Sequence, residues 1–173
     1  MTDEQLRESM ESGIFWITHC IVQGSYPDAA KLQALRKMGV THIFNVGRTP
    51  SCIQAGSSGF KEIVDLPIDD LKQLQHEFVL GFLYQFHRAA MRPDSICYIH
   101  CIAGQNRSPT LLWLYFVACG LSVEAARELI EDRTLDAVAG HPSLVDEALI
   151  RRVQYYGKSI FFPLARPDVL TPA

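Results

Sequence analysis

The sequence contains no long apolar run and no excess of basic residues. No stretch approaches the roughly 18 consecutive apolar residues that a membrane-spanning helix requires. Residues 1–12 are polar and acidic, without the apolar core of a secretion signal. The formal net charge is −3 and the isoelectric point about 6.0, so bulk charge favours neither nucleic acid nor an anionic membrane surface as a partner. We therefore expect a cytoplasmic protein with no membrane span, in which any anion site is local.

Paired and metal-binding cysteines are absent from the sequence pattern. The five cysteines are odd in number and show no metal-ligand spacing, and a chain of 173 residues with 48% apolar content can build its core without disulfide staples. We expect one globular domain in a reducing compartment, with no metal and no cofactor. Cys97 and Cys119 lie in apolar runs and are predicted core residues. Cys52 lies in a loop rich in Gly and Ser, and it is the candidate to reach Cys101 under oxidation.

The most informative stretch covers residues 95–109. Residues 96–99 form a short apolar run with β-branched and aromatic side chains, which predicts a strand buried on both faces. A loop containing Gly104 follows, and Pro109 then lies where the first turn of a helix tolerates proline. Residues 111–119 are apolar nearly all round, so we expect the helix to be buried.

The loop between this strand and this helix has the composition of an anion cradle. Backbone N–H groups that end at a helix N-terminus converge on one spot and favour a phosphate-like anion. Gly104 permits the turn, and the planar fork of Arg107 can hold two phosphate oxygens. The N–H dipoles and the charge of Arg107 would both stabilise the thiolate of Cys101. In comparable settings the pKa of a thiol falls to roughly 3.5–7.5. A thiolate that faces a bound phosphorus atom is a nucleophile in position to attack.

Residues 100–109, with the sequence HCIAGQNRSP, resemble the signature of the cysteine-dependent protein tyrosine phosphatases. The Ala-Gly and Ser-Pro pairs within the motif resemble the dual-specificity branch of that superfamily. The strand before the motif and the helix after it agree with this resemblance, which covers about residues 14–162. It implies a phosphatase that works through a phosphocysteine intermediate.

The resemblance also implies a role for each residue of the motif. Cys101 would be the nucleophile and Arg107 would bind the phosphate. Ser108 would stabilise the leaving thiolate, and His100 would fix the loop backbone. Phosphate-binding contacts would come from Ile102, Ala103, Gly104, Gln105, Asn106 and Arg107. Ser108 has a second possible role as the N-cap of the following helix, and the two roles are compatible.

Two adjacent carboxylates, Asp69 and Asp70, follow a predicted strand at residues 61–66 and Pro67. Taken alone, either aspartate would cap the long helical pattern of residues 71–92 or interact with its dipole. In the family, an aspartate on this loop protonates the departing oxygen. The Pro-x-x-Asp spacing favours Asp70 over Asp69 as that general acid.

Strands and helices alternate along the rest of the chain. We predict one or two strands in residues 14–25, a strand at 40–46, and helices at 28–37, 122–133 and 143–157. This order predicts a single α/β domain with a twisted, mostly parallel sheet of four or five strands and helices on both faces, as in the protein tyrosine phosphatases. Residues 1–13 are expected to form a flexible N-terminal segment, 14–162 the catalytic domain, and 163–173, which are rich in proline, a loose tail.

The motif and its surroundings predict a metal-independent dual-specificity protein tyrosine phosphatase. Its partner would be a phosphorylated protein substrate, and it would remove phosphate from phosphotyrosine and phosphoserine or phosphothreonine. The alternatives are a phosphatase of phosphoinositides or of a phosphorylated carbohydrate, a non-catalytic phosphate-binding module, and sulfur transfer at a cysteine loop. The presence of Cys101, Arg107 and Asp70 counts against the binding module, and the Arg-Ser pair at this spacing counts against sulfur transfer. Residues 102–106 include no basic side chain to meet the additional phosphates of a lipid, so protein substrates are favoured. The segment 47–59 is flexible by composition, so the pocket should be shallow and accept phosphotyrosine and phosphoserine or phosphothreonine alike.

Overall fold

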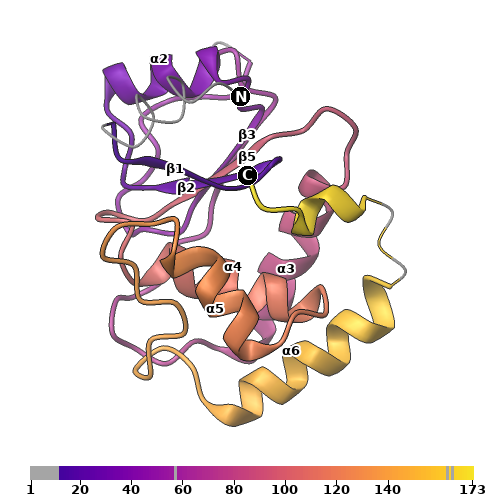
Figure 1. Ribbon diagram of the computed structural model, residues 1–173. Coiled ribbons are helices and arrows are strands. Elements are labelled where there is room, and N and C mark those ends of the chain that lie inside the picture. Colours follow the sequence, from indigo (N-terminus) through magenta and orange to yellow (C-terminus); the bar gives the residue numbers. More distant parts are fainter. Residues whose placement is uncertain (1–11, 57, 163, 165) are drawn as a thin grey trace.

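The computed structural model describes residues 12–56, 58–162, 164 and 166–173, and its centre is a five-stranded sheet (Figure 1). Along the chain the strands are β1 (Ile14–Thr18), β2 (Ile21–Gly24), β3 (His42–Asn45), β4 (Glu62–Asp65) and β5 (Cys97–His100). Their order in the sheet is β1-β2-β5-β3-β4, and all neighbours run parallel except β1 and β2. The predicted, mostly parallel sheet is confirmed, and β5 lies at its middle.

Helices cover both faces of the sheet (Figure 1). Helix α2 (Ala29–Lys37) lies on one face, and the other face carries α3 (His76–Ala90), α4 (Arg107–Ala118), α5 (Val123–Glu131) and α6 (Glu147–Ile160). The apolar side chains of α2 share a small core with the strands, whereas those of the other four helices share a larger one. The predicted α/β domain with helices on both faces is therefore confirmed.

Helix α4 is buried over its whole length, as its apolar sequence predicts. It begins at Arg107, four residues before the apolar run at Leu111, so the last residues of the motif lie in its first turn. Together β5, residues 101–106 and α4 form the predicted strand, loop and helix. Burial on both sides holds the loop between two rigid elements.

The helix predicted to begin at residue 71 begins five residues later, at His76. Leu71 has a φ of 54°, a left-handed conformation that a right-handed helix excludes. The backbone N–H of Leu74 donates to the carbonyl oxygen of Leu144 at 2.9 Å, so a tertiary hydrogen bond replaces a helical one. The two adjacent aspartates thus lie in the connection before α3, and the reading of either one as its N-cap is wrong.

The last helix, predicted to begin at residue 143, begins at Glu147. The backbone N–H of Ser143 donates to His141 Nδ1 at 3.2 Å, which places Ser143 in a turn. The carboxylate of Asp146 is the side-chain cap of α6, since it accepts a hydrogen bond from the backbone N–H of Leu149 at 2.7 Å.

The C-terminal residues pack on the domain, so the prediction of a loose tail from residue 163 is wrong for the described part. The guanidinium of Arg166 donates hydrogen bonds to backbone carbonyl oxygens between α3 and β5. Its Nη1 donates to the carbonyl oxygens of Ala90, Arg92 and Ser95 at 3.1, 2.8 and 3.1 Å. The 3₁₀ helix η1 (Pro167–Leu170) follows, its Val169 side chain is fully buried, and the chain then forms a bridge with β1. Proline suits the first turn of such a helix because its φ is already fixed.

The remaining expectations about the fold concern the cysteines and the N-terminus. Cys97 and Cys119 lie inside the core, as their apolar surroundings predict. Residues 1–11, most of the segment expected to be flexible, lie outside the described residues. Within the described part of the chain, no helix combines the length and the apolarity needed to cross a bilayer.

Candidate active site

The candidate site lies at the carboxyl end of β5. His100 ends this strand, and in the parallel register it pairs with Gly24 of β2 and Asn45 of β3. The loop of residues 101–106, hereafter the phosphate loop, leaves His100 and enters α4. The ends of three neighbouring strands therefore meet beside it, which is where open α/β sheets hold their ligands.

The phosphate loop turns at Gly104, where two separate constraints require glycine. Its φ is 79°, in the left-handed region that favours glycine. A Cβ atom at this position would lie 2.8 Å from the carbonyl oxygen of Gly24, which is closer than real contacts allow. The backbone of β2 and the loop can approach each other only because Gly104 has no side chain.

Cys101 lies at the start of the phosphate loop with its side chain buried. Two donors point at Cys101 Sγ: the backbone N–H of Gly104 at 3.3 Å and the hydroxyl of Ser108 at 3.4 Å. Burial alone raises the pKa of the thiol, but the hydrogen bonds from Ser108 and Gly104 and the charge of Arg107 outweigh it. The pKa of Cys101 therefore lies below its ordinary value, the direction that the loop composition predicted.

The guanidinium of Arg107 is buried beside the phosphate loop and only partly satisfied. Its Nη1 donates to the carbonyl oxygen of Ile68 at 3.5 Å, and its Nη2 lies 3.5 Å from Asp70 Oδ2. Its Nε is buried and has no hydrogen-bond partner among the described residues. Buried donors without partners are rare in folded proteins. The fork of Arg107 thus retains a donor for an anionic ligand.

The structure separates the two adjacent aspartates. Asp70 is the one whose carboxylate approaches the guanidinium of Arg107. The carboxylate of Asp69 instead lies 3.3 Å from Arg48 Nη1 and 3.3 Å from Lys72 Nζ, two largely exposed cations. Asp70 is therefore the aspartate that the structure brings to the phosphate loop.

His100 is buried and packs between aromatic rings. Its Nδ1 lies 3.0 Å from the carbonyl oxygen of Cys101, and since a carbonyl oxygen only accepts, this nitrogen carries the proton. The imidazole stacks on Tyr98 and meets the ring of Tyr26 edge-on, with ring centroids 5.5 and 5.4 Å apart. Burial lowers the pKa of His100 to about 4. A neutral imidazole can fix the backbone of Cys101, but it brings no positive charge to the sulfur.

The other residues of the phosphate loop present few side chains to the site. Ile102, Ala103 and Gln105 are exposed, and the carbonyl oxygen of Gln105 accepts a hydrogen bond from the backbone N–H of Val138 at 2.8 Å. Asn106 occupies the N-cap position of α4, without a capping hydrogen bond from its side chain. Ser108 therefore lies inside the helix, and the second role predicted for it, as the N-cap, is wrong.

Gln23 of β2 reaches the phosphate loop although no motif marks it. Its side chain is fully buried. Gln23 Nε2 donates to the carbonyl oxygen of Gly104 at 2.7 Å and to Ser108 Oγ at 3.2 Å. One amide thus contacts both residues that donate hydrogen bonds to Cys101 Sγ.

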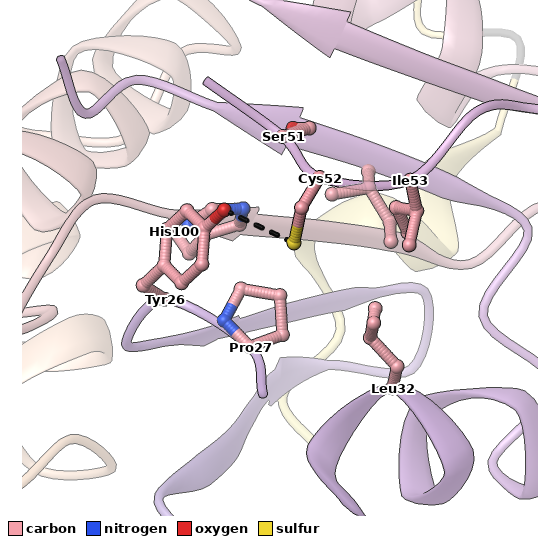
Figure 2. Close-up of a pocket in the computed structure, with 8 residues that line it drawn as sticks. Tyr26, Pro27, Leu32, Ser51, Cys52, Ile53 and His100 are labelled. Atoms are coloured by element: carbon pink, nitrogen blue, oxygen red, sulfur yellow. Dashed lines mark hydrogen bonds between the residues drawn. The ribbon is translucent and has the colours of Figure 1, made fainter. Parts of the chain in front are cut away.

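Tyr26 ties the phosphate loop to the segment that follows β3 (Figure 2). Its backbone N–H donates to the carbonyl oxygen of Ile102 at 2.9 Å. Its hydroxyl lies 2.8 Å from the carbonyl oxygen of Pro50 and 3.4 Å from Cys52 Sγ. Figure 2 shows the sulfur of Cys52 directed toward Tyr26, beside a mostly apolar cavity of about 10 Å³. The exposed thiol of Cys52 is therefore held against an aromatic side chain at the edge of the site.

The ends of β3 and β4 hold the first part of segment 47–59. Asn45 Nδ2 donates to Asp65 Oδ1 and to the carbonyl oxygen of Thr49, both at 2.7 Å. Asn45 Oδ1 accepts a hydrogen bond from the backbone N–H of Gly47 at 3.0 Å. The composition of this segment predicts flexibility, but its first residues are fixed by buried or half-buried hydrogen bonds.

A family model matches the part of the chain that carries this arrangement. The model described as the catalytic domain of dual specificity phosphatases matches residues 21–144. This match extends from β2 to the turn before α6, which is more than half of the chain, and includes the phosphate loop and both aspartates. The chain belongs to the dual specificity phosphatases.

A relative agrees with this family, and solved structures agree with the fold. The tyrosine-protein phosphatase vhp-1 of Caenorhabditis elegans is 29% identical over 115 residues, which are 65% of this chain and only 17% of that protein's length. The fold matches a mutant form of Tk-PTP at a TM-score of 0.69 and 18% identity, over 86% of this chain and 98% of that one. It also matches PTPMT1 in complex with PI(5)P at a TM-score of 0.63 and 17% identity, over 85% of this chain and 96% of that one. At these identities the two structures support the fold alone, and the predicted protein tyrosine phosphatase-like fold is confirmed.

No motif in the sequence of this phosphatase marks Gln23, Tyr26 or Asn45 as residues of the site. The signal for Gln23 was a polar residue inside an otherwise apolar strand, and the signal for Asn45 was an amide at the end of a buried strand. Both signals are weak, because neither says which distant segment the side chain reaches. Among the described residues, no group of three or more His, Cys, Asp or Glu side chains could hold a metal ion.

Proposed function

We propose that this phosphatase hydrolyses phosphotyrosine and phosphoserine or phosphothreonine esters of proteins through a phosphocysteine intermediate. The observation that carries the proposal is the environment of Cys101 Sγ. This sulfur accepts two hydrogen bonds beside the buried guanidinium of Arg107, which retains an unpartnered donor. Such a thiol ionises more easily than a free one, and it lies at the loop where a phosphate would be held.

In the first step, the thiolate of Cys101 attacks phosphorus. The sulfur–phosphorus bond forms as the bond between phosphorus and the ester oxygen breaks. Backbone N–H groups of residues 102–106 and the fork of Arg107 bind the non-bridging oxygens and stabilise their charge in the transition state. Asp70 gives its proton to the departing oxygen. Asp70 Oδ2 lies 3.5 Å from Arg107 Nη2, which supports Asp70 rather than Asp69 as the general acid.

In the second step, water attacks the phosphocysteine. The carboxylate of Asp70 takes a proton from the water, and the electron pair of the breaking sulfur–phosphorus bond returns to Cys101. The hydroxyl of Ser108, 3.4 Å from the sulfur, stabilises the returning thiolate. The neutral ring of His100 holds the backbone at Cys101 through both steps. Inorganic phosphate then leaves, and the cycle calls for no metal ion.

The rim of the phosphate loop favours protein substrates. Residues 102–106 carry no basic side chain, and the exposed side chains among them are those of Ile102, Ala103 and Gln105. An uncharged rim without aromatic side chains suits phosphate on a short serine or threonine as well as on tyrosine. We also propose that the catalytic domain covers residues 14–162 and works in the reducing cytoplasm, which its five free cysteines suit.

A phosphoinositide or a phosphorylated carbohydrate is the second candidate substrate. Arg48 and Lys72 lie beside the aspartate connection, and both are largely exposed. Two such cations could bind a further phosphate group of a multiply phosphorylated substrate. PTPMT1, a structural neighbour, has been solved with PI(5)P, which agrees with this alternative.

A substrate panel tests the proposed function. In the presence of a chelator, we expect turnover of an aryl phosphate and of matched phosphotyrosine and phosphothreonine peptides, with kcat/KM higher for the peptides than for a multiply phosphorylated inositol lipid. The double variant Arg48→Ala and Lys72→Ala serves as a matched control. It should leave peptide kcat/KM within roughly threefold of the wild type, since exposed charges contribute little. A strong preference for the inositol lipid that disappears in this variant would contradict the protein-substrate proposal.

A further inference from the structure

Gln23 is a buried amide whose position the fold of the sheet does not explain. It lies in β2 between Val22 and Gly24, and its strand partner in β5 is Ile99. The side chain is fully buried, and its Oε1 has no hydrogen-bond partner among the described residues. An apolar residue would fill a buried strand position without leaving such an oxygen. Local rules of this kind are most often broken at functional sites.

The hydrogen bonds of Gln23 fix the orientation of its amide. The carbonyl oxygen of Gly104 can only accept, so the amide atom 2.7 Å away must be the nitrogen. The same nitrogen lies 3.2 Å from Ser108 Oγ and supplies its second hydrogen there. The opposite orientation would place two oxygen atoms against each other at the Gly104 contact.

This orientation determines where the hydroxyl hydrogen of Ser108 goes. A serine hydroxyl has one hydrogen to donate and can accept at the oxygen. Because Gln23 donates to Ser108 Oγ, the hydrogen of that hydroxyl remains free for Cys101 Sγ, 3.4 Å away. The second donor to this sulfur is the N–H of Gly104, the residue whose carbonyl Gln23 also holds.

We propose that Gln23 is a positioning residue of this phosphatase, and that it acts on the Cys101 sulfur through Ser108 and Gly104. It holds both donors in place and directs the Ser108 hydroxyl toward the sulfur. The thiolate is thereby stabilised in the free enzyme and again when it leaves the phosphocysteine. The second effect rests on the proposed function, whereas the first concerns the thiol alone and can be measured without turnover.

The test uses Gln23→Met, which keeps the length of the side chain and removes the amide. The rate at which iodoacetamide alkylates Cys101 is followed against pH by site-resolved mass spectrometry, and the exposed Cys52 serves as an internal reference. We expect the midpoint for Cys101 to move to higher pH by about half a unit or more, since a donor to the thiolate is no longer held. The kcat for an aryl phosphate should fall roughly tenfold, with a larger phosphoenzyme burst.

A double-mutant cycle separates this positioning role from a merely structural one. Ser108→Ala should raise the alkylation midpoint as well. Gln23→Met added to it should then cause a smaller further shift than Gln23→Met alone, because only the effect through Gly104 remains to be lost. Gln23→Leu is the second variant if the methionine variant does not fold. The conservative change Ile21→Val in the same strand should leave the midpoint of Cys101 unchanged.

The outcomes distinguish this inference from the proposed function. An unchanged midpoint in folded Gln23→Met, or shifts that simply add in the double variant, would overturn the role of Gln23. Absence of turnover in the wild type would overturn the proposed function, while the alkylation profiles would still test Gln23.

Discussion

Replacing Cys101 with serine is expected to reduce turnover of every phosphate ester to the uncatalysed level. A serine hydroxyl ionises far less readily than a thiol, so the loop would hold no thiolate to attack phosphorus. The N–H groups of the phosphate loop and the fork of Arg107 would remain, and inorganic phosphate should still bind. Steady-state assays with an aryl phosphate and calorimetric titration with phosphate measure the two properties separately.

Cys52→Ser is the matched control for this loss. It makes the same chemical change at the exposed cysteine, and its hydroxyl can still accept a hydrogen bond from Tyr26. Its turnover under reducing conditions should equal that of the wild type. Residual activity above background in purified Cys101→Ser, or an equal loss in Cys52→Ser, would contradict the assignment of Cys101 as the nucleophile.

Replacing Asp70 with asparagine is expected to lower kcat by roughly 10² to 10⁴ on a phosphothreonine peptide. The alkoxide that departs from threonine needs a proton, which the amide of asparagine cannot supply. An aryl phosphate with a stable leaving group should lose much less. The diagnostic quantity is the ratio of the two losses, measured on the same enzyme preparation.

Asp69→Asn is a close control, because it makes the same substitution one residue away. The carboxylate of Asp69 faces Arg48 and Lys72 rather than Arg107. The kcat of the Asp69→Asn variant should stay close to that of the wild type on both substrates. If Asp69→Asn shows the leaving-group dependence and Asp70→Asn does not, the general acid has been assigned to the wrong aspartate.

The parts of the fold that the sequence predicts well are those fixed by local pattern. The apolar run before His100 and the apolar helix after Pro109 specify a buried strand and a buried helix through residue types alone. The cradle between them follows from the same short stretch, since its Cys, Gly, Arg and Ser all lie within eight residues. Local sequence therefore predicted the strand, the loop and the helix correctly.

The parts that sequence analysis misplaced depend on contacts between distant residues. The helical spacing of apolar residues continues through Leu71 and Leu74. The backbone N–H of Leu74, however, donates to the carbonyl oxygen of Leu144, so this segment is not helical. The proline-rich C-terminus is held by Arg166, whose backbone acceptors lie more than 70 positions away. Gln23 reaches residues 81 and 85 positions further on. No periodicity or motif encodes such pairings.

If the phosphoryl group passes through the sulfur of Cys101, the phosphocysteine intermediate can be trapped. The enzyme is mixed with an aryl phosphate, denatured within the first turnover, digested and analysed by mass spectrometry. Ser108→Ala is treated in parallel, because slower departure of the thiolate should let the intermediate accumulate. We expect a peptide that carries one phosphoryl group on Cys101, more abundant in Ser108→Ala than in the wild type and absent from Cys101→Ser. Full turnover with no burst and no phosphorylated Cys101 peptide in either enzyme would contradict the phosphocysteine intermediate.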